Sequence, residues 1–202
     1  MTEEALTSLV LIIRLGLVTI LLWILSRVWD IWRDWDKRKK QQAAYIRALF
    51  AEIDFNTADM SRFLSSAPPL SAFEKLFKDP GFIPHITDAR HTDVYRTSMS
   101  ELSVLSDDLI GDIVRFYGDL EKVRNQIAGL LLPSFAVIST KGKVGTIGNI
   151  YRTCQDSEKL GVRILADMGR QYGHLRLQRR HPPQLSKPLE TDTKSSQRHD
   201  AE

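Results

Sequence analysis

Residues 6–28 read LTSLVLIIRLGLVTILLWILSRV, and this stretch decides how the rest of the chain is interpreted. Arg14 and Arg27 are its only charged residues. A helix of roughly 23 residues is about 34 Å long, which is enough to cross a hydrocarbon core of about 30 Å. The sequence therefore predicts one transmembrane helix near the N-terminus and a tethered domain after it.

A cleaved signal peptide is the main alternative for an apolar segment in this position. It needs a basic start and small residues at the cleavage point, whereas here Glu3 and Glu4 precede the run and no A-x-A pattern follows it. Among the residues that flank the span, lysines and arginines occur only on the C-terminal side. Because cytoplasmic flanks are enriched in these residues, we expect the N-terminus outside and the following domain in the cytoplasm.

Aromatic and basic residues continue from the span. Three tryptophans recur every third residue and so form one stripe along a helix, as expected for indole rings in the headgroup region. A basic cluster follows, which either contacts acidic lipid headgroups or acts as stop-transfer charge. An alternative for the stripe is docking of another helix. The predicted membrane-interface residues are Trp29, Trp32, Trp35, Lys37, Arg38, Lys39 and Lys40.

Arg14 is the one charge well inside the predicted span. A buried arginine in a membrane is costly and is often functional. Arg14 also lies near the outer end of the apolar run, where its long side chain can extend to the interface. Small and hydroxyl residues elsewhere in the span allow weak self-association, although no GxxxG motif is present.

Helical periodicity continues beyond the membrane. No Pro or Gly lies between Gly16 and Pro68, so we expect one helix to carry the span into the next domain as far as residue 64. Further helices are expected over residues 71–77, 93–105 and 106–132, and from residue 144 or 149 to 177. Ser71 and Ser106 are the expected N-caps.

These elements predict an all-α fold, in which the N-terminal transmembrane helix continues into an antiparallel bundle of about three long helices plus short ones. We divide the chain into an anchor with its juxtamembrane segment at residues 1–40, a helical bundle at 41–178 and a tail at 179–202. The tail is polar, contains proline and lacks aromatic residues, which predicts disorder.

Four groups of residues carry side chains that could support chemistry. The polar line of Glu52, Asn56 and Asp59 is interpreted as solvated or as hydrogen-bonded to a neighbouring helix. His85, Asp88, His91 and Asp93 lie close in sequence, but they lack the regular spacing of zinc ligands, which favours an ordinary polar loop. Residues 141–148 are rich in glycine yet fail the P-loop pattern, so close packing or an elbow is preferred. Cys154 lies on an apolar stripe, which predicts a buried, inert thiol.

Composition excludes some classes of protein. A single cysteine excludes an intrachain disulfide, and a net charge of +3 is too small to indicate nucleic-acid binding. The sequence identifies no catalytic, cofactor-binding or metal-binding residue, no cofactor and no small-molecule substrate. The partners we expect are the lipid bilayer and either another protein or further copies of this chain.

Several strings resemble a loose group of uncharacterised bacterial single-pass membrane proteins. They are ALFAEIxxN at residues 48–56, Tyr95, ELSVL at residues 101–105 and IVRFYxxL at residues 113–120. The similarity covers about residues 5–175, and its motifs are core-type positions of low specificity. The resemblance implies a bacterial inner-membrane protein with an all-α domain, and it implies no activity.

Three classes of function follow from these observations. The first is a non-enzymatic interaction or scaffold module held at the bacterial inner membrane. The second is a membrane-active component, phage-associated or part of host defence, that acts on the bilayer through Arg14 and the tryptophan stripe; its domain could be periplasmic. The third is an enzyme built on scattered polar residues.

Overall fold

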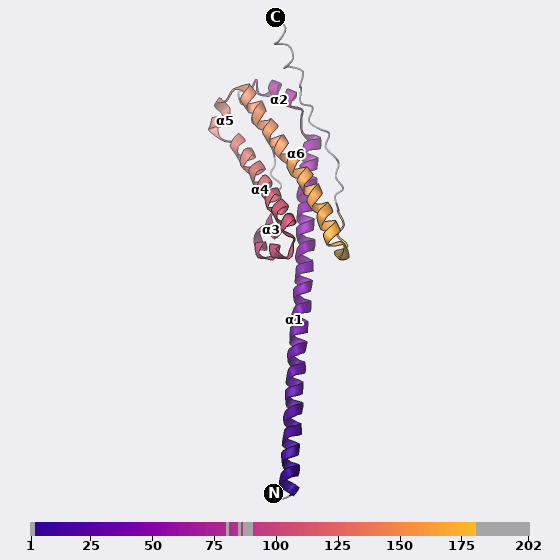
Figure 1. Cartoon of the computed structure of the whole chain (residues 1–202). Coiled ribbons are helices and arrows are strands. Elements are labelled where there is room, and N and C mark those ends of the chain that lie inside the picture. The colour runs from indigo at the N-terminus through magenta and orange to yellow at the C-terminus, as the bar shows by residue number, and fades with distance from the viewer. Residues whose placement is uncertain (1–2, 80, 85, 87–90, 181–202) are drawn as a thin grey trace. The chain divides into compact units, whose positions relative to one another are not determined.

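The fold is all-α. The structure is a computed structural model that describes residues 3–79, 81–84, 86 and 91–180, with side chains from residue 20 onward (Figure 1). Every regular element in this part of the chain is a helix, and no strand occurs in it, so the all-α prediction is confirmed. The chain divides into two compact units, residues 1–46 and 47–202, which are described separately below.

The first unit consists of the N-terminal part of α1 (Glu3–Ser66). α1 is continuous and ends two residues before Pro68, where the proline disfavours helical geometry in the residue before it. The predicted single helix through residue 64 is therefore confirmed. Within the described residues, no helix combines the length and the apolar character that crossing a membrane requires. Residues 6–19 of the predicted span have side chains that lie outside the described part.

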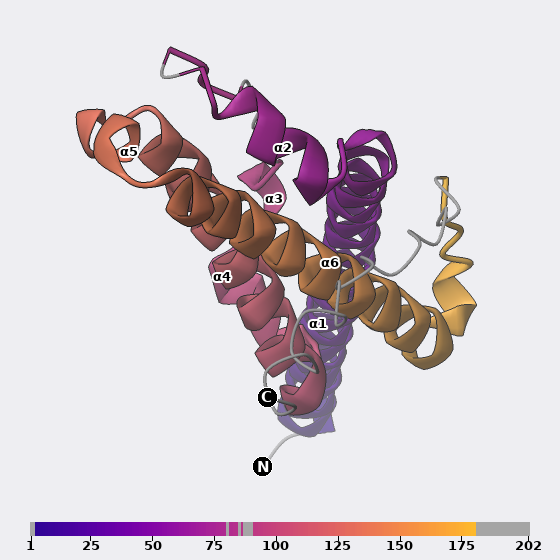
Figure 2. The ribbon, with the colours of Figure 1, turned by 90° about the horizontal axis from the view of Figure 1, so that it is seen from above.

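The second unit contains the rest of α1 and all later helices. These are α2 (Leu70–Leu76), α3 (Asp93–Thr97), the 3-10 helix η1 (Met99–Val104), α4 (Asp107–Leu130), α5 (Pro133–Val137), α6 (Thr140–Gln171) and the 3-10 helix η2 (Gly173–Leu175). α6 packs along α4 and also against α2. Figure 2 shows α6 crossing α4 and the part of α1 that belongs to this unit.

Apolar side chains of these helices form the core. An aromatic cluster joins the ends of α1 and α2 to the α4–α5–α6 hairpin, with the ring centroids of Phe77 and Phe135 5.9 Å apart and those of Phe63 and Tyr151 5.6 Å apart. Such ring pairs add stability beyond the area that they bury. The side chains that are most completely enclosed include Leu49, Ile53, Ile113, Phe116, Leu120, Ile147, Ile150, Ile164, Leu165 and Met168.

Three helices meet at Gly161. A Cβ atom at this position would lie 2.1 Å from Thr57 Oγ1 on α1 and 2.9 Å from Phe116 Cε2 on α4. Thr57 Oγ1 donates to the Ile53 carbonyl oxygen at 2.7 Å, which fixes the hydroxyl beside the glycine. The three helices can therefore approach this closely because Gly161 has no side chain.

The segment at residues 93–105 differs from the prediction of one helix. It contains α3 and η1, with a break at Ser98, whose φ and ψ of −124° and 32° are not helical. Serines and a threonine fill this stretch, and their side chains compete with helical backbone hydrogen bonds. Thr97 and Ser103 both donate to backbone carbonyls here.

The start of α6 was also predicted wrongly. α6 begins at Thr140, before either predicted start, and residues 141–148 are helical rather than an elbow. Ser139 is the N-cap, because its side chain accepts a hydrogen bond from the Gly142 amide at 3.2 Å. The helix ends at Gln171 rather than at residue 177, and η2 follows.

The predicted N-caps of α2 and α4 differ from what the structure shows. α2 begins at Leu70 with Pro69 in the N-cap position, so Ser71 lies inside the helix. Ser106 is the N-cap residue of α4 as predicted, but its hydroxyl bonds Gln171 Oε1 at 3.1 Å instead of capping. α4 ends at Leu130, two residues earlier than expected, because Pro133 begins α5.

Replacing Gly161 with alanine tests the helix crossing. We expect Gly161→Ala to lower the free energy of unfolding by about 1–3 kcal/mol, the usual cost of forcing a methyl group into a packed core. Urea unfolding of the full chain in detergent, followed by helical circular dichroism, measures this change. Gly145→Ala is the matched control, because a Cβ atom there would have nothing within 4 Å and alanine favours the helix. Equal effects of the two substitutions would contradict the close crossing.

Candidate functional site

Glu52 anchors the start of α3 to α1. Its carboxylate accepts hydrogen bonds from the Val94 amide at 2.7 Å, from the Tyr95 amide at 3.1 Å and from the Tyr117 hydroxyl at 2.5 Å. Amides in the first turn of a helix lack helical partners, and a carboxylate there also complements the helix dipole. Glu52 is therefore a capping group supplied by a different helix.

The rings of Tyr95 and Tyr117 complete this arrangement. They stack with centroids 3.9 Å apart and an interplanar angle of 4°. Glu52 thus binds the backbone amide of Tyr95 and also the hydroxyl of Tyr117, the ring on which Tyr95 stacks. The sequence left Glu52 either solvated or hydrogen-bonded to a neighbouring helix, and no pattern in it pointed to this stack.

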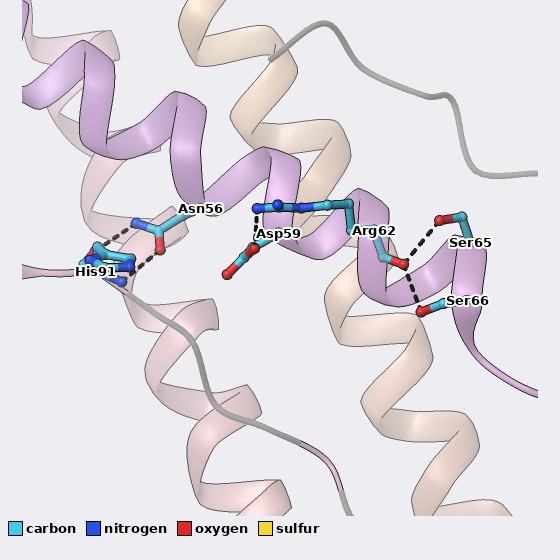
Figure 3. Close-up of polar contacts among 6 residues, drawn as sticks. All are labelled: Asn56, Asp59, Arg62, Ser65, Ser66 and His91. Carbon is cyan, nitrogen blue, oxygen red and sulfur yellow. Dashed lines mark hydrogen bonds and ion pairs between the residues drawn. The ribbon is translucent and has the colours of Figure 1, made fainter. Parts of the chain in front are cut away.

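Asn56, one turn after Glu52, holds the residues before α3 (Figure 3). Its side-chain amide donates to the His91 carbonyl oxygen at 2.6 Å, and its carbonyl oxygen accepts from the His91 amide at 2.8 Å. This pair of hydrogen bonds imitates pairing between two backbones. Two turns of α1 therefore fix residues 91–95, so that of the two alternatives left open for the polar line the hydrogen-bonded one holds for Glu52 and Asn56.

Asp59, the third member of the line, has a different role. Its carboxylate forms an ion pair with Arg62 along the same helix (Figure 3). The Arg62 carbonyl oxygen accepts hydrogen bonds from Ser65 and Ser66, both at 2.9 Å, near the end of α1. Asp59, Arg62 and Ser66 form the polar edge of a cavity.

That cavity has a volume of about 500 Å³ and lies beside the end of α1, α2 and α6. Its polar edge carries Asp59, Arg62 and Ser66, and the remaining lining is mainly apolar: Phe63, Ala67, Pro68, Phe73, Leu76, Phe82, Pro84, Ile86 and Tyr151. The Tyr151 hydroxyl donates to the Pro68 carbonyl oxygen at 3.0 Å. Aromatic walls with few polar groups suit an apolar ligand or an apolar side chain of a partner.

A second recess, of about 310 Å³, lies between α4 and α6 and is polar. Its lining combines three basic and two acidic side chains with polar ones: Arg115, Asp119, Lys122, Gln126, Asn149, Arg152, Thr153 and Asp156. The Oε1 atom of Gln126 is buried there without a hydrogen-bond partner. The mixture of charges does not select one ligand.

Asp54 holds the chain after α6. Its buried carboxylate accepts from Arg179 Nε and from the Arg180 amide, both at 2.9 Å. The sequence assigned residues 179–202 to a disordered tail, but Arg179 and Arg180 are bonded to the bundle. Residues 181–202 lie outside the described part of the chain.

The predicted interface residues belong to the first unit. Trp29, Trp32 and Trp35 are more than half exposed, and the rings of Trp29 and Trp32 lie 5.6 Å apart. The Lys39 ammonium lies 3.5 Å from the centre of the Trp35 ring, a cation–π contact. Lys37, Arg38 and Lys40 are exposed, with Lys40 paired to Asp36. The side chain of Arg14 lies outside the described residues.

The structure describes only two of the four residues that the sequence suggested as possible metal ligands. His91 and Asp93 are described, whereas His85 and Asp88 fall outside the described residues. Among the histidines, cysteines, aspartates and glutamates that are described, no group is arranged to hold a metal ion. The imidazole of His91 packs edge-on against Phe55, with ring centroids 4.3 Å apart.

Cys154 is buried in the aromatic core, as predicted. Burial raises the pKa of its thiol to about 12, and burial also raises the pKa of the neighbouring Tyr151 to about 12, with a smaller contribution from Cys154. A thiol that keeps its proton is a poor nucleophile. The structure therefore confirms the inert, core-type cysteine.

Comparison with known proteins adds no relative: neither a protein-family model, nor a curated protein, nor a solved structure matches this chain.

Removing the charge of Glu52 tests its capping role. We expect Glu52→Gln to lower the free energy of unfolding by about 1.5–3 kcal/mol, the usual contribution of hydrogen bonds to a charged group. Urea unfolding in detergent measures the change. Glu101→Gln, at an exposed position of η1, is the control and should change stability by less than about 0.5 kcal/mol. A Glu52→Gln protein as stable as the control would refute the capping role.

The raised pKa values predict a loss of stability in alkali. Near pH 7 both the folded and the unfolded chain keep the Cys154 and Tyr151 protons. Above about pH 9 the unfolded chain loses the thiol proton while the folded chain retains it, so stability falls by about 1.4 kcal/mol per pH unit for that group until about pH 12. Cys154→Ala should reduce this slope between pH 9 and 10 in urea unfolding measured at several pH values. An unchanged slope would contradict the assignment.

Proposed function

We propose that this chain is a membrane-anchored helical-bundle protein with a non-enzymatic role, which holds a protein partner or further copies of itself at the bacterial inner membrane. The anchor is residues 6–28, with the N-terminus outside and the bundle in the cytoplasm. The observation that carries the proposal is the exposed apolar surface of α1 in the first unit.

From Ile20 to Trp35, every large apolar side chain of α1 is exposed. The exposed fractions reach 61% for Leu22 and 68% for Trp23, and the full set is Ile20, Leu21, Leu22, Trp23, Ile24, Leu25, Val28, Trp29, Ile31, Trp32 and Trp35. Residues 20–25 are apolar on all sides of the helix, and such a surface needs lipid or protein around it, since water solvates it poorly. The sequence of residues 6–19 is also mainly apolar, with Arg14 as its only charged residue.

The change in character after Trp35 supports an interface at this point. The tryptophan stripe ends where four consecutive basic residues, 37–40, begin. Indole rings and basic side chains favour the headgroup region and the cytoplasmic face of a membrane. The Lys39–Trp35 contact joins the two kinds of residue on one helix face.

The second unit supports binding rather than catalysis. The carboxylate of Glu52 and the amide of Asn56 are used to attach residues 91–95 to α1. The apolar cavity offers aromatic walls and one ion pair, which suits recognition of an apolar group. The resemblance to bacterial single-pass membrane proteins agrees with this proposal and supplies the inner membrane as the expected location.

Alkaline extraction of bacterial membranes tests the anchor. We expect the full chain to remain with the membrane pellet in carbonate. Leu17→Asp should release it, because an aspartate near the middle of a span costs about 2.5–3.5 kcal/mol of insertion free energy. Met99→Asp is the matched control, since Met99 is an exposed apolar residue of the second unit. Extraction of the unmodified chain by carbonate would overturn the proposal.

Reporter fusions and membrane potential separate the remaining alternatives. A reporter that is active only in the cytoplasm should be active when fused after residue 202, and activity of a periplasm-specific reporter at the same position would reverse the orientation. Expression of the full chain should leave the membrane potential unchanged. Depolarisation on expression would favour the membrane-active alternative over a scaffold.

A further inference from the structure

The turn between α4 and α6 displays a second set of exposed apolar residues. Leu131 and Leu132 precede α5 and are 70% and 57% exposed. Val137 is the last residue of α5 and Ile138 follows it, and they are 86% and 42% exposed. Figure 1 shows α5 at the end of the α4–α6 hairpin. We call these four residues the hairpin tip.

The hairpin tip is held outward by the fold. Phe135, in the middle of α5, is buried in the aromatic core, and its amide donates to the Leu132 carbonyl oxygen at 2.9 Å. Leu130 is buried immediately before the tip, and Ser139 caps α6 immediately after it. The four apolar side chains are therefore displayed on a well-anchored turn rather than on a frayed end.

Along the chain, the residues that flank the hairpin tip include basic residues and no acidic ones. No aspartate or glutamate occurs in residues 122–155, whereas the basic residues of this range are Lys122, Arg124, Lys141, Lys143 and Arg152. Lys141 is exposed two residues after Ser139, and Arg124 pairs with Glu121. Lys143 is buried with its ammonium 5.7 Å from the centre of the Phe135 ring. Acidic side chains are thus absent from the sequence flanking the tip.

We propose that the hairpin tip docks on the surface of a bilayer that contains anionic lipid, with its four aliphatic side chains inserted at the headgroup level. Protruding aliphatic residues beside the exposed Lys141 match an anionic membrane surface in both chemistry and charge. A protein partner is less well matched, because binding hot spots on proteins are enriched in Trp, Tyr and Arg, whereas the tip is aliphatic. This contact is separate from the anchor of the first unit.

A fluorescent label at Val137 reports this contact. Val137→Cys is labelled with an environment-sensitive nitrobenzoxadiazole maleimide in the full chain, reconstituted in nanodiscs. Cys154 remains unlabelled because it is buried and its thiol stays protonated. The matched control carries the label at Lys159→Cys, an exposed site of α6 away from the tip. Circular dichroism of both proteins verifies that the helices are intact.

Two lipid arrangements are compared. In one, the nanodisc itself contains phosphatidylglycerol, and in the other a phosphatidylcholine nanodisc is mixed with phosphatidylglycerol vesicles. We expect a blue shift and quenching by spin-labelled lipid for the Val137 label in at least one arrangement, and none for the Lys159 label. Adding Lys141→Ala should weaken the response by about fivefold in lipid concentration, as one basic residue near an anionic surface contributes.

Three outcomes overturn the proposal. They are no shift in either arrangement, an equal shift with phosphatidylcholine alone, and a shift that depends on protein concentration without lipid, which would indicate contact between two copies of the chain. The anchor is monitored separately, because all four tryptophans lie at residues 23–35. Quenching of tryptophan by brominated lipid without a response at Val137 would retain the anchor and reject the tip.

Discussion

The second unit depends on a crossing that only a glycine permits. At Gly161 the backbone of α6 comes so close to Thr57 of α1 and Phe116 of α4 that a methyl group has no room. The three longest helical segments of the unit therefore meet at one point, and their apolar faces close around it. Because a packed core has little free volume, a change at this point is transmitted to all three helices.

Polar side chains of α1 form hydrogen bonds to segments that bury little apolar surface of their own. α3 has five residues and buries none of them fully, so it gains little from packing. Glu52 and Asn56 replace that missing stabilisation with hydrogen bonds to the backbone at residues 91–95. Asp54 does the same for Arg179 and Arg180 beyond the last helix. α1 thus uses two of its faces, one with Glu52 and Asn56 and the other with Asp54, to hold segments that are distant in sequence.

Both units expose large apolar side chains among the described residues. In the first unit these lie at residues 20–35, where three tryptophans precede a run of basic residues. The second unit encloses its aromatic rings but leaves four aliphatic side chains exposed at the α4–α6 turn. The cost of leaving such groups in water is the physical reason to assign both surfaces a role at a membrane or with a partner.

The sequence by itself determined the helical class, the unbroken first helix and the buried state of Cys154, because apolar spacing and the absence of Pro and Gly are local properties. For the glycines of residues 141–148 it left close packing and an elbow open, and it started the helix too late, since helix propensity yields to packing against a neighbouring helix. Only the tertiary structure decided which polar residues are used within the fold. Glu52, Asn56 and Asp54 bond to groups between 35 and 126 residues away, and these contacts depend on where several helices cross, which the periodicity of one helix does not report.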